Sequence, residues 1–254
     1  MNFFIDTHSH IYYDEYKYDL PDIISKAEEA DIGRIICIGT DIETSYESIR
    51  ISNEYENVFC TVGCHPHDTS KLKNNYINEL EEMCKNPKVV GIGETGLDYY
   101  YNHSSKEIQK KAFIEHIELS KDLNLPLVIH NRDSDEDLME ILRKHKPKGV
   151  IHCFSGNLEM AREVIKLGML ISFTGIVTFK NYTSFNIIKE INLKNFMLET
   201  DSPYLSPVPF RGKRNEPKNV KIIAQKIADL KNVSIEEIKI QTTRNAFRLF
   251  HRLK

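Results

Sequence analysis

Eight short apolar runs alternate with longer amphipathic segments, and this alternation restricts the fold more than any other feature of the chain. Each run is almost continuously apolar, which is typical of strands buried on both faces of a parallel sheet. The runs predict strands at residues 3–7, 34–39, 58–63, 89–93, 126–130, 149–152, 170–173 and 195–199.

The segments between the runs carry the periodicity of surface helices. They predict helices near residues 21–30, 43–55, 75–85, 105–124, 134–145, 157–167, 183–191, 216–230 and 235–251. Two start signals stand out, because Ser104 precedes Glu107 and Ser234 precedes Glu237 at the spacing of a capping box. We therefore expect the fourth and the last helix to begin at these serines.

Eight strands, each followed by a helix, are the elements of a (β/α)8 TIM barrel, an α/β fold of about 250 residues. A doubly wound open sheet is the alternative arrangement of the same elements. No linker, low-complexity tract or short repeat divides the sequence. We therefore expect a single domain over residues 1–254.

Composition narrows the classes of partner. The chain has 34 basic and 37 acidic residues, a net charge of -3, so a nucleic acid would have to be held by a local patch. No apolar run approaches the roughly 18 residues of a membrane span, and no basic region precedes Asp6 as in a signal peptide. The five cysteines are odd in number and form no CxxC pair. These features predict a cytoplasmic protein with reduced thiols and no membrane partner. We further expect a monomer or weak oligomer.

Histidines and carboxylates gather at the carboxyl ends of the predicted strands, where (β/α)8 enzymes place their active sites. Residues two apart on a strand point to the same side, so His8 and His10 can face one centre, and Glu199 and Asp201 share a face. Glycines on both sides of Glu94 predict a carboxylate exposed at the barrel mouth. The candidate metal ligands are His8, His10, Glu94, His130, His152 and Asp201.

Four imidazoles and two carboxylates suit one or two divalent cations of the Zn, Mn, Co or Mg type. Burying Glu199 and Asp201 together is costly unless a cation offsets their charge. Two cations bridged by Glu94 would suit the hydrolysis of a phosphodiester or a carbonyl compound. The sequence thus predicts a metal-dependent hydrolase.

Seven short motifs stand in order along nearly the whole chain. They are DTHSH (6–10), GCHPH (63–67), GIGETGLDY (91–99), HNR (130–132), HCFSG (152–156), ETDSPYL (199–205) and RGKRNEP (211–217). In these motifs the sequence resembles the TatD family of metal-dependent deoxyribonucleases, within the amidohydrolase superfamily. The resemblance implies a TIM barrel and a nuclease that typically removes nucleotides from single-stranded DNA in the 3′-to-5′ direction.

The resemblance also implies roles for individual residues. It assigns His8, His10 and Asp201 to one metal, His130 and His152 to a second, and Glu94 to both, where other members of the superfamily use a carbamylated lysine. His65 matches a position linked to substrate binding or catalysis, and Glu199 a position near the metals. Asp201 and His65 are the candidate acceptors of the proton of the attacking water. The candidate catalytic residues are Glu94, Asp201, His65 and Glu199.

Substrate binding requires local positive charge and surfaces for unpaired bases. Arg132 follows His130 closely, and the loop 211–214 contains three cations and one glycine. The tyrosines at 99–101 follow the Glu94 motif and could stack on bases. The candidate substrate-binding residues are His65, His67, Tyr99, Arg132, Arg211 and Lys213, with single-stranded DNA, RNA or tRNA as the substrate.

Three other functions remain open for the same residues. A deacylase acting on aminoacyl-tRNA and an amidohydrolase opening a small cyclic amide would use the same metal chemistry. A metal-dependent scaffold without turnover is the third possibility. The histidines outside the strand ends are expected to be structural or surface residues; these are His103, His116, His145 and His251.

Overall fold

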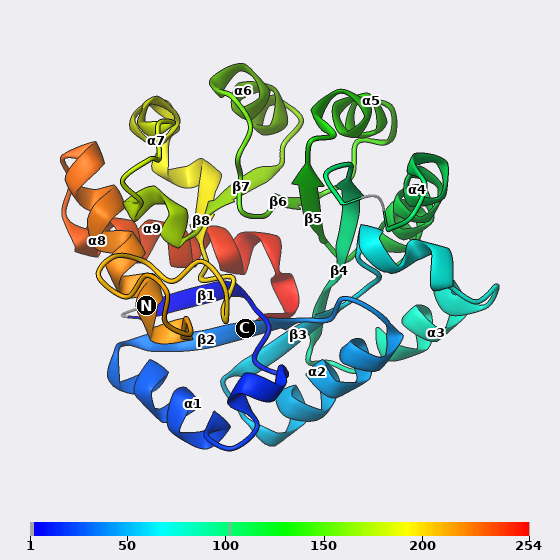
Figure 1. Ribbon diagram of the computed structural model, residues 1–254, viewed down its shortest axis with the longest axis horizontal. Helices are drawn as coiled ribbons and strands as arrows, with labels where there is room; N and C mark the ends of the chain where they lie inside the picture. Colours follow the sequence, from blue (N-terminus) through cyan, green and yellow to red (C-terminus); the bar gives the residue numbers. More distant parts are fainter. Residues whose placement is uncertain (1–2, 102, 254) are drawn as a thin grey trace.

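The computed structural model describes residues 3–101 and 103–253, and it is a TIM barrel with the helices outside the strands (Figure 1). Eight parallel strands are hydrogen-bonded in sequence order from β1 to β8, so the open-sheet alternative is excluded. The strands are β1 (Phe4–Ser9), β2 (Ile32–Ile38), β3 (Val58–Val62), β4 (Val89–Asp98), β5 (Leu127–Arg132), β6 (Gly149–Ile151), β7 (Leu170–Phe173) and β8 (Phe196–Leu198).

The first and last strands meet at their carboxyl ends. Ser9 and Ser202 form a parallel bridge, and the Thr7 hydroxyl donates a hydrogen bond to the Leu198 carbonyl at 3.0 Å. The backbone N–H of Asp201 donates to the His8 carbonyl at 2.9 Å. This junction brings the residues that follow β8 beside the end of β1, although 191 positions separate Thr7 from Leu198.

The helices that cover the barrel are α1 (Leu20–Glu29), α2 (Ile42–Glu54), α3 (Tyr76–Met83), α4 (Lys106–Asp122), α5 (Asp135–His145), α6 (Leu158–Lys166), α7 (Phe185–Glu190) and α8 (Val220–Lys231). Their buried apolar faces pack on the outer side of the strands in one large core. Among the described residues no helix is both long and apolar enough to cross a membrane.

The ninth helix, α9 (Ile235–Leu249), has a different position (Figure 1). It crosses the space enclosed by the other helices, and Ala246, Phe250 and Leu253 pack against side chains that point into the barrel. Those side chains alternate along each strand with the outward ones; Ile5 and Ile36 are examples. The end of α9 therefore fills the amino-terminal end of the barrel and leaves the carboxyl-terminal end for polar groups.

The predicted helix starts are partly correct. Ser234 forms the predicted capping box with Glu237 at the start of α9. The start of α4 differs, because Ser105 rather than Ser104 caps it by accepting from the N–H of Ile108. The hydroxyl of Ser104 donates to the His67 carbonyl at 3.0 Å instead. Two adjacent serines offer the same local signal, and a tertiary contact decides between them.

The strand bounds differ most at β4. The prediction ended this strand at residue 93, whereas β4 continues to Asp98. Glu94 therefore lies inside the strand and not in the loop after it. This difference determines the geometry of the site.

Candidate metal centre

A bulge in β4 directs Glu94 into the barrel mouth. Between β4 and β5 the pairing moves from Ile92 with Leu127 to Thr95 with Ile129, so three steps on β4 match two on β5. Such a bulge bends its strand and turns a side chain toward a new direction. The N–H of Glu94 donates at 2.8 Å to the carbonyl of Gly39, which follows β2. The side chain is buried, with 4% of its surface exposed, which corrects the expectation of an exposed carboxylate.

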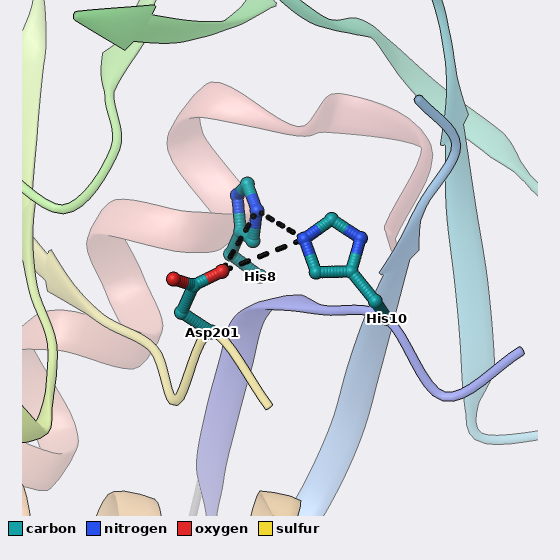
Figure 2. Close-up of side chains that lie close together, drawn as sticks. All are labelled: His8, His10 and Asp201. Atoms are coloured by element: carbon teal, nitrogen blue, oxygen red, sulfur yellow. Dashed lines mark hydrogen bonds and ion pairs between the residues drawn. The ribbon is translucent and has the colours of Figure 1, made fainter. Parts of the chain in front are cut away.

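One oxygen of Glu94 faces the end of β1. Its Oε2 lies 3.4 Å from Nε2 of His8 and 3.7 Å from Nε2 of His10. Oδ1 of Asp201 lies 3.6 Å and 3.4 Å from the same two nitrogens. The two ring nitrogens are 3.2 Å apart (Figure 2). Residues from both ends of the chain thus form one group of converging ligand atoms.

The other oxygen of Glu94 faces the ends of β5 and β6. Its Oε1 lies 3.0 Å from Nδ1 of His130 and 2.9 Å from Nε2 of His152. These two ring nitrogens are 3.2 Å from each other. The carboxylate of Glu94 therefore lies between two imidazole pairs, with one oxygen turned to each, which is the arrangement of a bridging ligand.

The surroundings of the outer nitrogens of His10 and His152 indicate which nitrogen of each ring is free to bind a cation. Nδ1 of His10 lies 3.0 Å from the Ile38 carbonyl, which can only accept, so in the neutral ring Nε2 carries a lone pair. Nδ1 of His152 faces Oε1 of Glu199 at 3.7 Å, and Nε2 again points inward. Inward lone pairs of this kind beside carboxylate oxygens fit divalent cations, and imidazole ligands favour transition metals such as Zn over Mg.

The same groups shift one another's ionisation. Burial opposes ionisation of Glu94, but the nearby imidazoles, His152 foremost, outweigh it and hold the pKa of Glu94 well below its usual value. Burial also opposes protonation of His152, yet Glu94 and Glu199 raise the pKa of His152 well above its usual value. Glu94 is therefore ionised at neutral pH and attracts positive charge.

Glu199 and Asp201 do not share a face, contrary to the period-two expectation. Strand β8 ends at Leu198, and Asp201 lies in the left-handed region with φ of 56°, so the alternation of a strand no longer applies. Oε1 of Glu199 accepts the N–H of Cys153 at 2.6 Å. Glu199 thus lies behind His152 instead of facing the inner centre, while Asp201 faces His8 and His10.

His65 is close to Glu94 but oriented differently from the other imidazoles. Its Nδ1 accepts the N–H of His67 at 3.2 Å, so the proton of the neutral ring is on Nε2. That nitrogen lies 3.5 Å from Oε1 of Glu94. A ring that presents N–H to the centre is a hydrogen-bond donor and not a metal ligand. Burial and the nearby His130 keep the pKa of His65 well below its usual value, so this ring is neutral.

Comparison with known proteins decides the family. The family model described as TatD related DNase matches residues 5–251. The chain belongs to the TatD family. Relatives with this similarity over their full length include the uncharacterized metal-dependent hydrolase YabD of Bacillus subtilis, which is 42% identical over 249 residues covering 96% of this chain and 98% of the relative.

The uncharacterized metal-dependent hydrolase YcfH of Escherichia coli K12 is 37% identical over 256 residues, which cover 98% of this chain and 96% of the relative. Among solved structures, YJJV, a TatD homologue from Escherichia coli K12, superposes with a TM-score of 0.92 at 27% identity and covers 98% of both chains. The chain is accordingly a metal-dependent hydrolase of the TatD family with the TIM barrel of that family.

One buried residue of this TatD-family site was missed in the sequence. Asp98 ends β4 with 1% of its surface exposed, and its Oδ2 lies 3.1 Å from Nε2 of His130 and 3.0 Å from Nε2 of His67. The prediction ended the strand five residues earlier, which removed the signal that Asp98 is also at a strand end. His67 itself is brought near His130 through this shared carboxylate.

An exposed cationic and aromatic surface adjoins the second imidazole pair. The guanidinium of Arg132, at the end of β5, lies 4.1 Å from the ring centre of Tyr100 and 4.8 Å from that of Tyr101. Tyr101 also stacks on His103, which is exposed and was expected to be a surface residue. Tyr99 is turned away, since its hydroxyl donates to Asp137 at 2.6 Å, and so it is not brought to this surface.

The loop after β8 contributes two available cations, not three. Arg214 is held by Asp19 at 2.6 Å and by the Glu15 carbonyl. Arg211 is exposed and lies 3.8 Å from the ring centre of Phe179, and Lys213 is exposed beside Phe210. Arg214 therefore anchors the loop to the start of α1, while its neighbours remain on the surface.

The remaining histidines lie outside the centre. His116 is buried in α4, where Nδ1 lies 2.7 Å from the Ala112 carbonyl and Nε2 accepts the N–H of Cys64. His145 contacts Glu118 on the outer helices, and His251 is exposed at the amino-terminal end of the barrel.

Proposed function

We propose that this TatD-family hydrolase cleaves phosphodiester bonds of DNA and removes nucleotides from the 3′ end of single strands. One observation carries the proposal. Glu94 turns one oxygen to each of two imidazole pairs, and exposed cations lie beside this centre at the same mouth of the barrel. A centre for two cations next to a positively charged surface suits a polyanion better than a small neutral compound.

The proposed ligand set follows the two groups of atoms. His8, His10 and Asp201 would hold one cation, His130 and His152 would hold the other, and Glu94 would bind both. When bound, divalent cations of the Zn, Mn, Co or Mg type supply Lewis acidity and a hydroxide nucleophile near neutral pH.

The chain's own residues hold and move protons around this centre. Asp201 is the more accessible of the two inner carboxylates, with 14% of its side chain exposed against 4% for Glu94. It is therefore the group that accepts the proton of the attacking water. His65 presents its Nε2–H to the centre and donates a hydrogen bond to a phosphoryl oxygen. This bond stabilises the charge that develops on the oxygen in the transition state. The negative charge of Glu199, 3.7 Å from Nδ1 of His152, favours a proton on that nitrogen.

The substrate surface extends from the second imidazole pair. Arg132 binds a phosphate through its guanidinium while it lies over Tyr100 and Tyr101, on which unpaired bases stack. Arg211 and Lys213 bind phosphates on the loop after β8.

The test is a substrate panel on protein that has been stripped with a chelator and reloaded with Mg²⁺, Mn²⁺, Co²⁺ or Zn²⁺. Single-stranded DNA labelled at either end, single-stranded RNA, aminoacyl-tRNA and a cyclic amide are offered to wild type and to Glu94→Gln. We expect stepwise loss of nucleotides from the 3′ end of DNA that depends on added metal and is abolished in Glu94→Gln.

Other outcomes contradict the proposal in distinct ways. Release of the amino acid from aminoacyl-tRNA without loss of nucleotides indicates a deacylase, and ring opening alone indicates an amidohydrolase of small molecules. Binding of DNA without hydrolysis under any metal indicates a scaffold. Cleavage at internal positions of the DNA strand would support the assignment as a nuclease and contradict the assignment as an exonuclease.

A further inference from the structure

Asp98 gathers four hydrogen-bond donors on one buried carboxylate. Its Oδ2 faces Nε2 of His130 at 3.1 Å and Nε2 of His67 at 3.0 Å. Its Oδ1 accepts the backbone N–H groups of Tyr100 and Tyr101, both at 3.0 Å. One carboxylate therefore contacts a proposed metal ligand and the turn that carries two aromatic residues of the proposed substrate surface.

Helix α4 fixes the backbone of Asp98. The N–H of Asp98 donates to Oε1 of Gln109 at 2.8 Å, and Nε2 of Gln109 donates back to the Asp98 carbonyl at 2.9 Å. Gln109 is itself buried, with 1% of its surface exposed. The carboxylate is thus held in place independently of the histidines it contacts.

We propose that Asp98 is a positioning residue that selects Nδ1 of His130 as the atom available to the second cation. An ionised carboxylate only accepts hydrogen bonds, so it keeps the His130 proton on Nε2 and leaves the lone pair on Nδ1. Nδ1 is the nitrogen that lies 3.0 Å from Glu94 and 3.2 Å from Nε2 of His152. The proposal rests on the ligand set given above, and not on which substrate is hydrolysed.

The four donors explain why an amide cannot replace this carboxylate. An asparagine accepts on one side and donates on the other. Backbone N–H groups of Tyr100 and Tyr101 cannot become acceptors, whereas the two imidazoles can move their protons to Nδ1. In Asp98→Asn the amide nitrogen therefore turns toward His130 and His67. The His130 proton then moves to Nδ1, which removes the lone pair from the centre.

The first test is calorimetric titration of chelator-stripped Asp98→Asn with Mn²⁺ and, separately, with Zn²⁺. We expect one equivalent to bind as in wild type and the second to bind about 10- to 100-fold more weakly, the usual range for loss of such a partner. Glu115→Gln is the matched control, because it makes the same carboxylate-to-amide change on α4, where Glu115 accepts the Tyr76 hydroxyl and pairs with Lys111. Two equivalents with wild-type affinity in Asp98→Asn overturn the proposal.

The second test is read in the wild-type protein and uses a variant only to assign the signals. In ¹⁵N spectra of the zinc-loaded wild type, His130 should show a metal-bound Nδ1 and a protonated Nε2, while His10 and His152 show the reverse. The His130 signals are identified by their loss in His130→Gln. A metal-bound Nε2 in His130 overturns the proposal. Neither measurement uses hydrolysis, so failure of the nuclease assay leaves this result intact, and failure here leaves the nuclease assay intact.

Discussion

At the scale of single residues, the partner of the outer ring nitrogen decides what each imidazole can do. His10 faces a carbonyl and His152 faces Glu199, so both direct a lone pair inward. His65 accepts a backbone N–H and directs a proton inward instead. Three similar side chains around Glu94 therefore divide into ligands and a donor, and this division rests on contacts made on the side of each ring that faces away from Glu94.

Removing the imidazoles of His8 and His10 tests whether these two residues bind a different cation from His130 and His152. In His8→Ala/His10→Ala we expect the metal content to fall from two equivalents to one, because Asp201 and Glu94 alone leave too few donors for the first cation. Loss of its Lewis acidity costs several kcal/mol, which lowers kcat on the order of 10³-fold. Metal analysis after dialysis and a hydrolysis assay measure the two effects.

His251→Ala serves as the control for that double variant, since His251 is exposed at the opposite end of the barrel. It should retain both equivalents and the activity of wild type. Retention of two equivalents in the double variant would contradict the assignment of His8 and His10.

Burial of His116 makes the free energy of unfolding depend on pH. Burial lowers the pKa of His116 from 6.5 to about 4, so the folded chain binds its proton less readily than the unfolded chain. Stability from this group is therefore unaffected above pH 6.5 and falls between pH 6.5 and 4. The slope approaches about 1.4 kcal/mol per pH unit, or about 2 kcal/mol lost by pH 5.

His116→Gln isolates this contribution. The glutamine amide can donate to the Ala112 carbonyl and accept from the Cys64 N–H, as the neutral imidazole does, but it does not titrate. Urea unfolding of both proteins at pH 7.5, 6, 5 and 4.5 should show a difference that shrinks or reverses as the pH falls. Two curves that stay parallel over this range would refute the prediction.

At the scale of elements, the bulge in β4 shows where prediction from sequence ended. The strand order and the candidate ligands follow from apolar periodicity and from polar residues at strand ends. The extra residue between Ile92 and Thr95 does not, because register depends on the pairing of two strands and not on either sequence alone. Burial of Glu94 and the position of Asp98 both depend on that register. Glu199 and Asp201 diverge for a similar reason, since a left-handed residue breaks the alternation.

A substitution at Gly96 tests whether the close packing of β4 against β5 positions the proposed metal ligand His130. Gly96 has φ of 142°, and a Cβ there would overlap the carbonyl oxygen of His130. Gly96→Ala should therefore displace β5 and weaken binding of the second metal equivalent by about 10-fold or more, besides the backbone strain of about 1 to 3 kcal/mol. Titration with Mn²⁺ and urea unfolding separate the two effects.

Gly168→Ala is the matched control. Gly168 also has a positive φ, of 85°, but a Cβ there meets no atom within 4 Å. It should show a loss of stability of similar origin and wild-type affinity for both metal equivalents. If both variants bind metal equally well, the packing of Gly96 against His130 does not position the ligand.

At the scale of the whole molecule, the two ends of the barrel have separate tasks. Phe250 and Leu253 close the amino-terminal end with apolar contacts, and every proposed ligand lies at the other end. Phe250→Ala should cost about 3 to 5 kcal/mol of unfolding free energy, because its fully buried ring leaves a cavity. Unfolding in urea measures this cost, and calorimetry should still find two metal equivalents. Loss of a metal equivalent in the folded variant would show that the two ends are coupled.

The charge distribution of the whole molecule decides how salt acts on substrate binding. The net charge of -3 repels a polyanion, so attraction must come from Arg132, Arg211 and Lys213 at the mouth. If all three contact phosphates of a single strand, log K falls with log salt at a slope of about -2, and affinity drops about 20-fold between 50 and 200 mM. Binding of a labelled oligonucleotide in excess chelator, where no cleavage occurs, measures this slope by fluorescence anisotropy.

Removing two of the three cations should change the slope as well as the affinity. Arg211→Ala/Lys213→Ala leaves one phosphate contact and a slope of about -0.7, whereas loss of a contact to a base would lower affinity at every salt concentration and leave the slope unchanged. Lys111→Ala/Lys121→Ala removes the same charge from the outer helix α4 and should keep the wild-type slope. Equal slopes in the two double variants, both shallower than the wild-type slope, would mean that net charge governs binding. Equal slopes in all three proteins would mean that the loop after β8 contacts no phosphate, and the proposed path of the strand across this loop would then be wrong.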